Sequence, residues 1–294
     1  MRLAVIGAGA IGAVTAAAAA GHEVTVCART PIESLTLSCA DGSPFPSGVL
    51  PVRLASSPGA LVGGQVDMVF VTVKATDVGS CRPWLGPLCA PSTLVVAVQN
   101  GLDHAARFAG LVPAGTEVVP GLAYLAAERL GPGSVRHLSG SLMIVPSSVA
   151  GAVSEALPLM KVRGRDDMVT ACWQKLLGNL VANPLTALTM RRIDVIGEPG
   201  MADLARGLLR EAVAVGRAEG AEISDDDIEP IVVGTAQYGS ETGSSMLYDR
   251  LAGRPTEHEF LTGEVVRRGA AHGIDVPLSA AVLALLEAID RGRP

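Results

Sequence analysis

The sequence predicts an α/β protein in which a doubly wound parallel sheet is followed by a second, all-helical domain. Apolar runs in the first half of the chain are continuous rather than alternating, as expected for parallel strands covered on both faces. After the polar stretch Lys161–Asp167, apolar residues recur at helical spacing with few β-branched runs, which places the domain boundary near residues 164–167. We therefore expect one domain over residues 1–165 and another over residues 166–294.

The first domain opens with a strand, a glycine turn, a helix and a second strand, the order of a compact βαβ unit. Its expected elements are strands at Leu3–Ile6, Glu23–Ala28, Asp67–Val73 and Thr93–Val98, a helix at Ala10–Ala20, a crossover helix within Ala75–Cys89 that ends at Pro83 or Pro87, and an antiparallel edge on the same sheet built from Glu117–Val119, Leu122–Ala127, Ser134–Leu138 and Ser141–Val145. In the second domain, helices are expected at Val169–Met190, Met201–Glu219, Ile228–Tyr238, Thr256–His272 and Ser279–Ile289.

Composition and charge narrow the class of function. The 294 residues are 49% hydrophobic with a net charge of −6 and no Lys/Arg-rich block, so a disordered chain or a nucleic-acid-binding role has little support. The five cysteines are scattered without a CxxC pair, which favours buried thiols in a reducing compartment over disulfides or a metal site. No apolar run reaches transmembrane length, and glycines interrupt the apolar N-terminal stretch. We expect a cytoplasmic protein that binds no metal and no membrane.

A glycine-rich turn follows the first strand and opens the first helix. It reads Gly7-Ala8-Gly9-Ala10-Ile11-Gly12, the spacing of the Rossmann dinucleotide fingerprint. The first glycine permits the tight turn, the second lets the backbone approach the pyrophosphate, and the third lets the helix pack closely on the strand. We therefore expect a nicotinamide dinucleotide here.

The end of the second strand indicates which dinucleotide is bound. NAD sites usually place a carboxylate there, but this chain has Arg29, whose guanidinium can form paired hydrogen bonds with a 2′-phosphate. NADP(H) is therefore favoured, and a solvated surface arginine is the alternative. Lys74 and Asn100 end the next two strands and should lie near the nicotinamide half, unless they are a strand-end charge and an ordinary Asn-Gly turn.

Three polar residues lie four positions apart on the first expected helix of the second domain. Lys175, Asn179 and Asn183 share one face, and their neighbours are apolar, so they need partners or a ligand. A desolvated lysine can have its pKa lowered toward neutrality and protonate a carbonyl oxygen, while amides orient the substrate. The alternative is that a neighbouring helix satisfies these groups. Pro184 is expected to break the helix locally.

A second polar cluster covers residues 244–249 and 254–257. Its serine hydroxyls can bind a substrate carboxylate, and Glu257 can pair with or orient a catalytic lysine. Read differently, Thr256-Glu257 starts a helix whose acidic residues favour the N-terminal dipole. Ligands of such folds bind outside the carboxyl ends of the parallel strands, so a site in a cleft between the two domains is expected.

Taken together, these segments resemble the ketopantoate reductase (2-dehydropantoate 2-reductase) family. The matching segments run in order as GAGAIG, VKATD, QNG, WQKLLGNLVANPLTAL, SSMLYDR and GRPTEHEFLTGEVVRRGAAHGIDVP. The resemblance implies reduction of 2-dehydropantoate to (R)-pantoate by NADPH, in the pathway to pantothenate and coenzyme A. It implies that Lys175 and Glu257 are catalytic, that Asn179, Asn183, Ser245, Asn100 and Asp249 contact the substrate, and that Gly7 to Gly12, Arg29, Lys74, Asn100, Ala127 and Glu257 contact the cofactor.

Two departures from the family pattern keep other functions open. Thr242 stands where some members have an asparagine, and Thr189–Asp194 lacks another expected asparagine. A related NADPH-dependent reductase that acts on a different branched 2-oxo acid is therefore one alternative. A non-catalytic NADP(H)-binding redox sensor is another, and the presence of Lys175 and Glu257 argues against it. The apolar C-terminal helices either pack on their own domain or form a homodimer.

Overall fold

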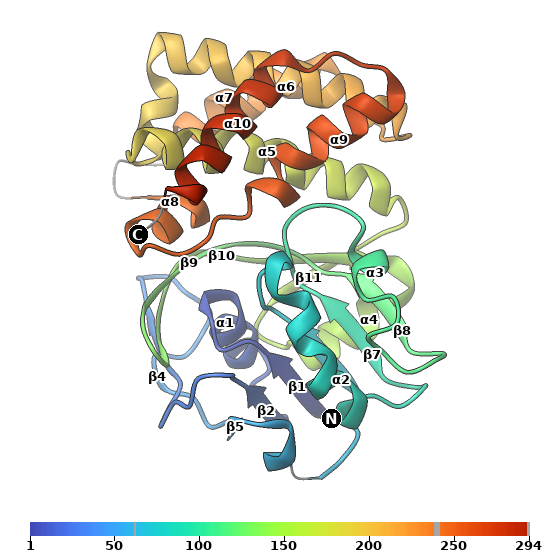
Figure 1. Ribbon diagram of the computed structural model, residues 1–294. Coiled ribbons are helices and arrows are strands. Elements are labelled where there is room, and N and C mark those ends of the chain that lie inside the picture. The colour runs from blue at the N-terminus through green and yellow to red at the C-terminus, as the bar shows by residue number, and fades with distance from the viewer. Residues whose placement is uncertain (62, 238–241, 293–294) are drawn as a thin grey trace. The chain divides into compact units, whose positions relative to one another are not determined.

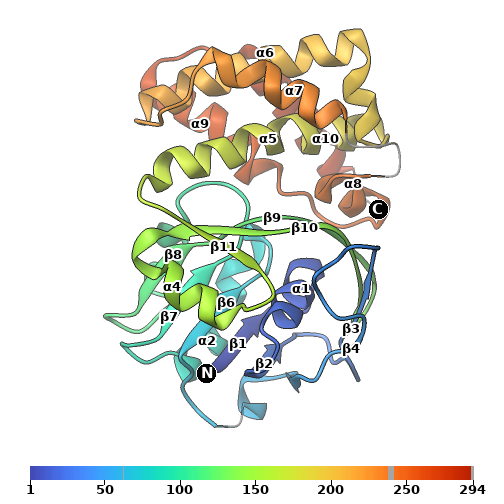
Figure 2. The ribbon, with the colours of Figure 1, turned by 180° about the vertical axis from the view of Figure 1, so that it is seen from behind.

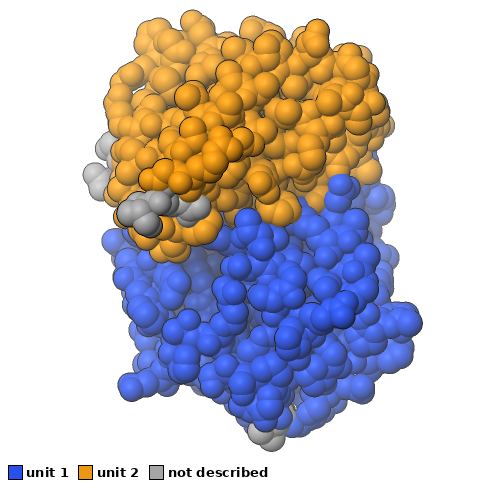
Figure 3. Space-filling model, viewed as in Figure 1, with its two compact units in different colours: residues 1–99, 103–168 blue, residues 100–102, 169–294 orange. Residues whose placement is uncertain are grey.

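The computed structural model describes residues 1–61, 63–237 and 242–292, and the chain divides into two compact units (Figures 1 and 3). Unit 1 consists of Met1–Gln99 and Asp103–Met168, and unit 2 of Asn100–Leu102 and Val169–Pro294. The short segment Asn100–Leu102 thus belongs to the second unit although both of its neighbours in the chain belong to the first.

A parallel sheet forms the centre of unit 1. Within the described ranges it has six strands in the order β5-β2-β1-β6-β7-β8, and all neighbouring pairs run parallel. Ile6 pairs with Cys27 on one side and with Val71 on the other, so three strands end at the same edge. The expected strands at the positions of β1, β2, β6 and β7 are confirmed. The bounds are β1 Arg2–Ile6, β2 Glu23–Cys27, β5 Arg53–Ala55, β6 Met68–Val71, β7 Leu94–Ala97 and β8 Glu117–Pro120.

A second sheet lies in the same unit, and helix α1 (Ala10–Ala18) packs against both sheets (Figure 1). The second sheet has the order β11-β10-β3-β4, with β9 paired to β10. Together the two sheets enclose one apolar cluster that includes Val14, Met143 and Val145. The bounds are β3 Thr36–Cys39, β4 Gly48–Val49, β9 Leu122–Gly131, β10 Ser134–Pro146 and β11 Lys161–Arg165.

The expected antiparallel edge on the first sheet is wrong. β8 continues that sheet in parallel, whereas β9 and β10 pair antiparallel in the second sheet. The two runs expected at 134–138 and 141–145 form the single strand β10, whose register shifts around Gly140. Gly140 has φ +76°, and a β-carbon there would lie 2.6 Å from the carbonyl oxygen of Tyr124. The glycine therefore lets the strand continue through an irregularity instead of ending it.

Helices cover the remaining faces of unit 1. Trp84, Leu85 and Phe108 pack on the first sheet from the side opposite α1. The expected crossover helix is a 3₁₀ segment followed by an α-helix, and Pro83 lies in the first turn of that α-helix rather than at its end, since a proline there loses no helical hydrogen bond. Figure 2 shows α4 beside β11. The bounds are η1 Pro58–Ala60, η2 Ala75–Cys81, α2 Arg82–Leu88, α3 His104–Arg107 and α4 Ser147–Ala156.

The described part of unit 2 beyond residue 168 contains only helices and connecting segments. Helix α5 runs without interruption through Pro184, so the expected break is wrong. A β-carbon on Gly216 would lie 2.9 Å from the Trp173 ring, which shows how closely α5 and α6 approach. The bounds are α5 Met168–Thr189, η3 Ile193–Gly197, α6 Pro199–Ala218, η4 Asp225–Asp227, α7 Ile228–Ala236, α8 Ser245–Leu251, η5 His258–Phe260, α9 Thr262–His272 and α10 Pro277–Arg291.

Two expectations for the helices need comment. The helix expected over Thr256–His272 is instead η5 followed by α9, with Thr256 and Glu257 in the segment before them. Tyr238, the expected end of another helix, lies outside the described residues. Among the helices in the described ranges, none combines the length and apolar character needed to cross a bilayer. The fold class, a doubly wound parallel sheet with a C-terminal helical domain, is confirmed.

Candidate active site

The glycine turn in unit 1 is shaped by close backbone contacts. Gly7 has φ +114°, and its N–H donates to the carbonyl oxygen of Cys27 over 2.9 Å. A β-carbon on Gly12 would lie 1.8 Å from the Gly7 oxygen, so only glycine fits where the helix crosses the strand end. By contrast, a β-carbon on Gly9 would meet nothing within 4 Å. The three glycines therefore differ in conformation and surroundings in the way expected for a dinucleotide-binding turn, and their contacts with a cofactor stay a prediction.

Thr72 supports this turn, and the sequence reasoning missed it. Its hydroxyl lies 3.1 Å from the oxygen of Ile6 and 2.9 Å from that of Gly7, so it holds the strand end and the turn together. Gly9 is the N-cap of α1 and supplies no side-chain cap. The first N–H groups of the helix and the open space beside Gly9 fit a pyrophosphate group.

Arg29 and Lys74 follow strands that flank β1. The Arg29 guanidinium forms an ion pair with Asp77, with 3.2 Å between Nη2 and Oδ2. Lys74 is half-buried and is the N-cap residue of η2. Ala127 lies in the middle of β9, paired with His137 on β10. It packs on the apolar cluster that also touches Ala10 and Ile11 of the glycine turn and α1.

A second set of supporting contacts surrounds the end of β7. Gln99 donates from Nε2 to the oxygen of Val73 over 3.0 Å, which ties the ends of β6 and β7 together. His104 contacts the Gln99 oxygen through Nε2 at 2.9 Å, and Arg107 donates to Gln99 Oε1 over 3.3 Å. Burial, followed by the charge of Arg107, lowers the pKa of His104 to about 4, so this histidine is neutral. Gln99 and Asn100 both belong to the Gln-Asn-Gly segment, but only Asn100 was predicted from the sequence to be a site residue.

In unit 2, five predicted site residues form one chain of hydrogen bonds that ends on the carboxylate of Glu257. Asn183 donates to Asn179 over 3.3 Å, Asn179 donates to Asn100 over 3.1 Å, and Asn100 donates to Glu257 over 3.2 Å. Ser245 donates to Asn183 over 2.8 Å at the other end. Every amide in this chain donates through Nδ2 and accepts through Oδ1, so the partners fix its orientation. The structure therefore brings together five residues that the sequence predicted in three separate segments, at Asn100, at Asn179 and Asn183, and at Ser245 and Glu257.

Lys175 lies on the same face of α5, one turn before Asn179. Lys175 is half-buried, and desolvation of its ammonium group lowers the pKa of Lys175 to about 8. An ammonium group with this pKa is still largely protonated at neutral pH but is a stronger acid than an ordinary lysine. It can therefore act as a proton donor near physiological pH.

The start of α8 is attached to α5 by residues that the sequence reasoning missed or assigned differently. Ser244 is the N-cap, accepts from the N–H of Leu247 over 3.1 Å and lies 2.6 Å from the Thr186 hydroxyl. Asn183 is 4% exposed and its Oδ1 also accepts from the N–H of Met246 over 3.1 Å. Asn183 thus caps α8, whereas Ser245 is exposed at the surface of this cluster.

The remaining predicted residues have structural contacts. Asp249 is buried, and its Oδ1 accepts from Nε of Arg254 over 3.0 Å. Thr242 accepts through its backbone oxygen from the N–H of Ile193 over 3.0 Å, so the two departures from the family pattern contact each other. The assignment of Asp249 to the substrate stays a prediction.

The segment that carries Glu257 is held by the last turn of α10. Asp290 Oδ2 accepts from the N–H of Thr256 over 3.1 Å and lies 3.2 Å from its hydroxyl. His258 Nδ1 lies 2.8 Å from the same hydroxyl and 3.5 Å from the same carboxylate oxygen. Contacts on both sides of Glu257 therefore fix its position.

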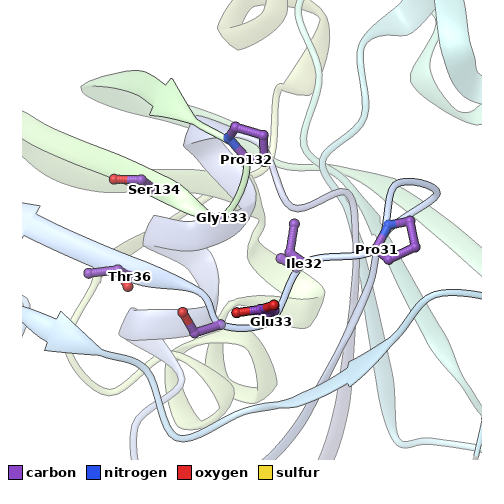
Figure 4. Close-up of a pocket in the computed structure, with 8 residues that line it drawn as sticks. Pro31, Ile32, Glu33, Thr36, Pro132, Gly133 and Ser134 are labelled. Carbon is purple, nitrogen blue, oxygen red and sulfur yellow. The ribbon is translucent and has the colours of Figure 1, made fainter.

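A pocket outside these groups lies in unit 1 (Figure 4). It has a volume of about 400 Å³ and is formed by the segment after β2 and the turn between β9 and β10. It contains none of the predicted site residues. Its lining residues are Pro31, Ile32, Glu33, Ser34, Thr36, Pro132, Gly133 and Ser134.

Comparisons with known proteins identify the family to which the chain is similar. The family model "Ketopantoate reductase PanE/ApbA" matches residues 3–148, and the model "Ketopantoate reductase PanE/ApbA C terminal" matches residues 167–290. The 2-dehydropantoate 2-reductase of Caulobacter vibrioides is 39% identical over 292 residues, which cover 97% of this chain and 98% of that protein. The enzyme of the same name from Mycobacterium tuberculosis is 33% identical over 297 residues, with 99% and 98% covered. A crystal structure of 2-dehydropantoate 2-reductase from Geobacter metallireducens aligns with a TM-score of 0.89 at 27% identity, covering 98% of this chain and 99% of that one.

Proposed function

The chain belongs to the ketopantoate reductase family, and we propose that it reduces 2-dehydropantoate to (R)-pantoate with NADPH, a step toward pantothenate and coenzyme A. Family membership also confirms the prediction of an oxidoreductase that uses a nicotinamide dinucleotide, over that of a non-catalytic sensor. The observation that carries the proposal is the hydrogen-bond chain from Ser245 to Glu257, which lies beside the lysine of lowered pKa on α5.

The proton of the reduction comes from Lys175 in this proposal. As the carbonyl becomes an alcohol, its oxygen takes up one proton, and the Lys175 ammonium is acidic enough to donate it. Asn179 lies one turn further along α5 and offers an amide whose orientation is fixed by Asn100 and Asn183. A fixed amide can orient substrate oxygens without adding charge.

Substrate recognition is assigned to the exposed end of the same chain. Ser245 is exposed, and its one hydroxyl proton, which it donates to Asn183 Oδ1 in this structure, can be donated to a substrate carboxylate oxygen instead. Asn100 and Asn183 contribute chiefly by holding their neighbours, and Asp249 fixes Arg254. Glu257 is buried and anchors the amide of Asn100, which keeps the donors of this cluster aligned.

The cofactor is assigned mainly to residues of the 1–165 domain, and the reacting groups above to the 166–294 domain. When bound, NADPH supplies the hydride. The turn from Gly7 to Gly12 holds the pyrophosphate, Arg29 holds the 2′-phosphate, and Lys74 and Ala127 make further contacts. The open space beside Gly9 and the uncapped start of α1 support this assignment.

Two further points belong to the proposal. The five cysteines are free thiols, which supports a cytoplasmic location. Leu278 and Leu285 on α10 are exposed, which supports a homodimer. Light scattering coupled to size-exclusion chromatography measures the mass in solution and tests that second point.

The central experiment compares steady-state reduction of several branched 2-oxo acids with NADPH and with NADH. We expect 2-dehydropantoate with NADPH to have the highest kcat/KM. A higher kcat/KM for another branched 2-oxo acid would overturn the substrate assignment while leaving the reductase chemistry in place.

A further inference from the structure

We propose that Asp77 is a specificity-determining residue that weakens binding of the cofactor 2′-phosphate and so limits the preference for NADPH over NADH. This inference rests on the proposed role of Arg29. It concerns a residue within the VKATD segment to which neither the family resemblance nor the sequence reasoning gave a role.

The position of the ion pair in the fold is the first argument. Arg29 follows β2 and Asp77 lies in η2, which follows β6, and these two strands pair with β1 on its opposite sides. The glycine turn comes directly after β1 at the same edge of the sheet. The 3.2 Å pair between Arg29 and Asp77 therefore joins the two sides of the edge from which the glycine turn begins.

Exposure of the pair is the second argument. The side chains of Arg29 and Asp77 are 62% and 39% exposed. Exposed ion pairs contribute little to folding, because water and salt screen them and two long side chains must be ordered. Replacing Asp77 should therefore change the stability of the fold little, so that a change in the affinity of a charged ligand for Arg29 can be measured on a folded protein.

The charge of the ligand is the third argument. A phosphate monoester carries between one and two negative charges at neutral pH, so it is attracted to Arg29 and repelled by the carboxylate paired with it. Repulsion between two unit charges about 4 Å apart in water corresponds to about a five-fold change in a binding constant. A ribose 2′-hydroxyl carries no charge and can donate a hydrogen bond to a carboxylate. Asp77 therefore opposes NADPH and tolerates NADH.

The test measures binding of 2′,5′-ADP and of 5′-ADP by isothermal titration calorimetry, without any turnover. We expect Asp77→Asn to tighten binding of 2′,5′-ADP about five-fold and not to tighten 5′-ADP. The matched control is Glu23→Gln, which also removes one carboxylate from an exposed ion pair of unit 1, with Arg53 at 3.1 Å. Glu23 pairs with Arg2 at the start of β1, so it lies at the other end of these strands, and its loss should change neither affinity.

A third variant separates this inference from the role of Arg29. Arg29→Ala should weaken binding of 2′,5′-ADP much more than binding of 5′-ADP, and an equal change in affinity for the two ligands would refute the 2′-phosphate assignment itself. If Arg29→Ala weakens 2′,5′-ADP as expected but Asp77→Asn leaves its affinity unchanged or lower, Arg29 keeps its role and the inference about Asp77 is overturned. The ratio of kcat/KM for NADPH to that for NADH should rise in Asp77→Asn by the same factor as the affinity for 2′,5′-ADP.

Discussion

Asn100 donates from Nδ2 to Oε2 of Glu257 over 3.2 Å, although the two are 157 positions apart in the chain. The carbonyl oxygen of the same side chain accepts from Asn179 on α5 over 3.1 Å. With a partner on each side, the Asn100 amide has one orientation, and so has the amide of Asn179. The amides that we propose to contact a substrate are thus held in fixed positions by the protein itself.

Replacing Lys175 with alanine should remove the proton donor. We expect kcat to fall by about 10²- to 10⁴-fold, the usual contribution of a general acid, with the Kd for NADPH little changed. Stopped-flow turnover and fluorescence titration with NADPH measure the two quantities. Lys161→Ala is the control, because Lys161 is an exposed lysine at the start of β11, and it should behave as wild type. A Lys175→Ala defect confined to NADPH binding would contradict the assignment.

The pH dependence of kcat follows from the same residue. Because the pKa of Lys175 is lowered to about 8, the ammonium form predominates below that pH and is lost above it. Reduction needs the protonated form, so kcat should fall as the pH rises through about 8. In Lys175→Arg the guanidinium does not titrate in this range, and this limb should disappear from the pH profile. An unchanged limb in that variant would assign it to another group.

Replacement of Asn183 should lower the stability of the fold, whereas replacement of Ser245 should weaken substrate binding. Asn183→Ala leaves the buried N–H of Met246 without its acceptor and should lower the free energy of unfolding by about 1–3 kcal/mol. Ser245→Ala removes an exposed hydroxyl, so it should leave that free energy nearly unchanged and raise the KM for the 2-oxo acid. Urea denaturation and steady-state kinetics on both variants check this contrast. A stable Asn183→Ala variant would show that the capping of α8 matters little.

Asp290 should affect turnover although it lies in the last turn of α10. Asp290→Ala removes the acceptor for the N–H and hydroxyl of Thr256, so Glu257 next to it loses its fixed position. We expect kcat to fall about 10-fold, less than the roughly 10²-fold loss that a misplacement of about 1 Å at the reacting groups can cause. Asp290→Asn keeps an oxygen acceptor and should recover most of the activity. Asp275→Ala, at an exposed position before α10, is the control. Loss of unfolding free energy without loss of kcat would limit Asp290 to a structural role.

A charge cluster between α6 and α9 should make stability depend on pH. Burial of the Glu219 carboxyl opposes its ionisation, but hydrogen bonds from His272 and Arg268 outweigh burial and hold the pKa of Glu219 below 4.5. A carboxyl whose pKa is lowered by folding stabilises the protein fully above about pH 4.5, and that contribution is lost as the pH falls through the folded-state pKa. Glu219→Gln should therefore lower the free energy of unfolding at pH 7 by about 1–3 kcal/mol and flatten its decline in acid. Urea denaturation at several pH values measures both effects, and parallel curves for the two proteins would contradict the prediction.

The sequence predicted those parts of the fold that depend on local patterns. The strands at β1, β2, β6 and β7 are continuous apolar runs, and the spacing of Lys175, Asn179 and Asn183 placed them on one helix face. Strands such as β3, with Thr36 and Ser38 in four residues, have no such pattern, because their place is set by pairing with β10. Pro184 has none of the expected effect, since α5 is held along its length by the packing of residues on both sides of it.

Contacts between residues far apart in the chain could not be predicted from the sequence. Residue types at the site were predicted from motifs, but the link from Asn100 to Glu257 joins residues 157 positions apart. The pair of Arg29 and Asp77 depends on the strand order β2-β1-β6, which no periodicity contains. The capping of α8 by Asn183 could not be predicted either, because an amide on α5 can bind a ligand as readily as it can accept from the first turn of another helix.

The membership of Asn100–Leu102 in unit 2 limits how this chain could be recombined with others. A gene fragment that starts at residue 169 encodes the helices but not Asn100, and would leave Glu257 and Asn179 without the amide between them. Exchange of the C-terminal half between relatives therefore preserves the hydrogen-bond chain only if the recipient already carries an asparagine after the strand that corresponds to β7, the fifth strand of the parallel sheet. We therefore expect the segment Asn100–Leu102 and the helices after residue 168 to be inherited together, although the rest of unit 1 separates them in the sequence.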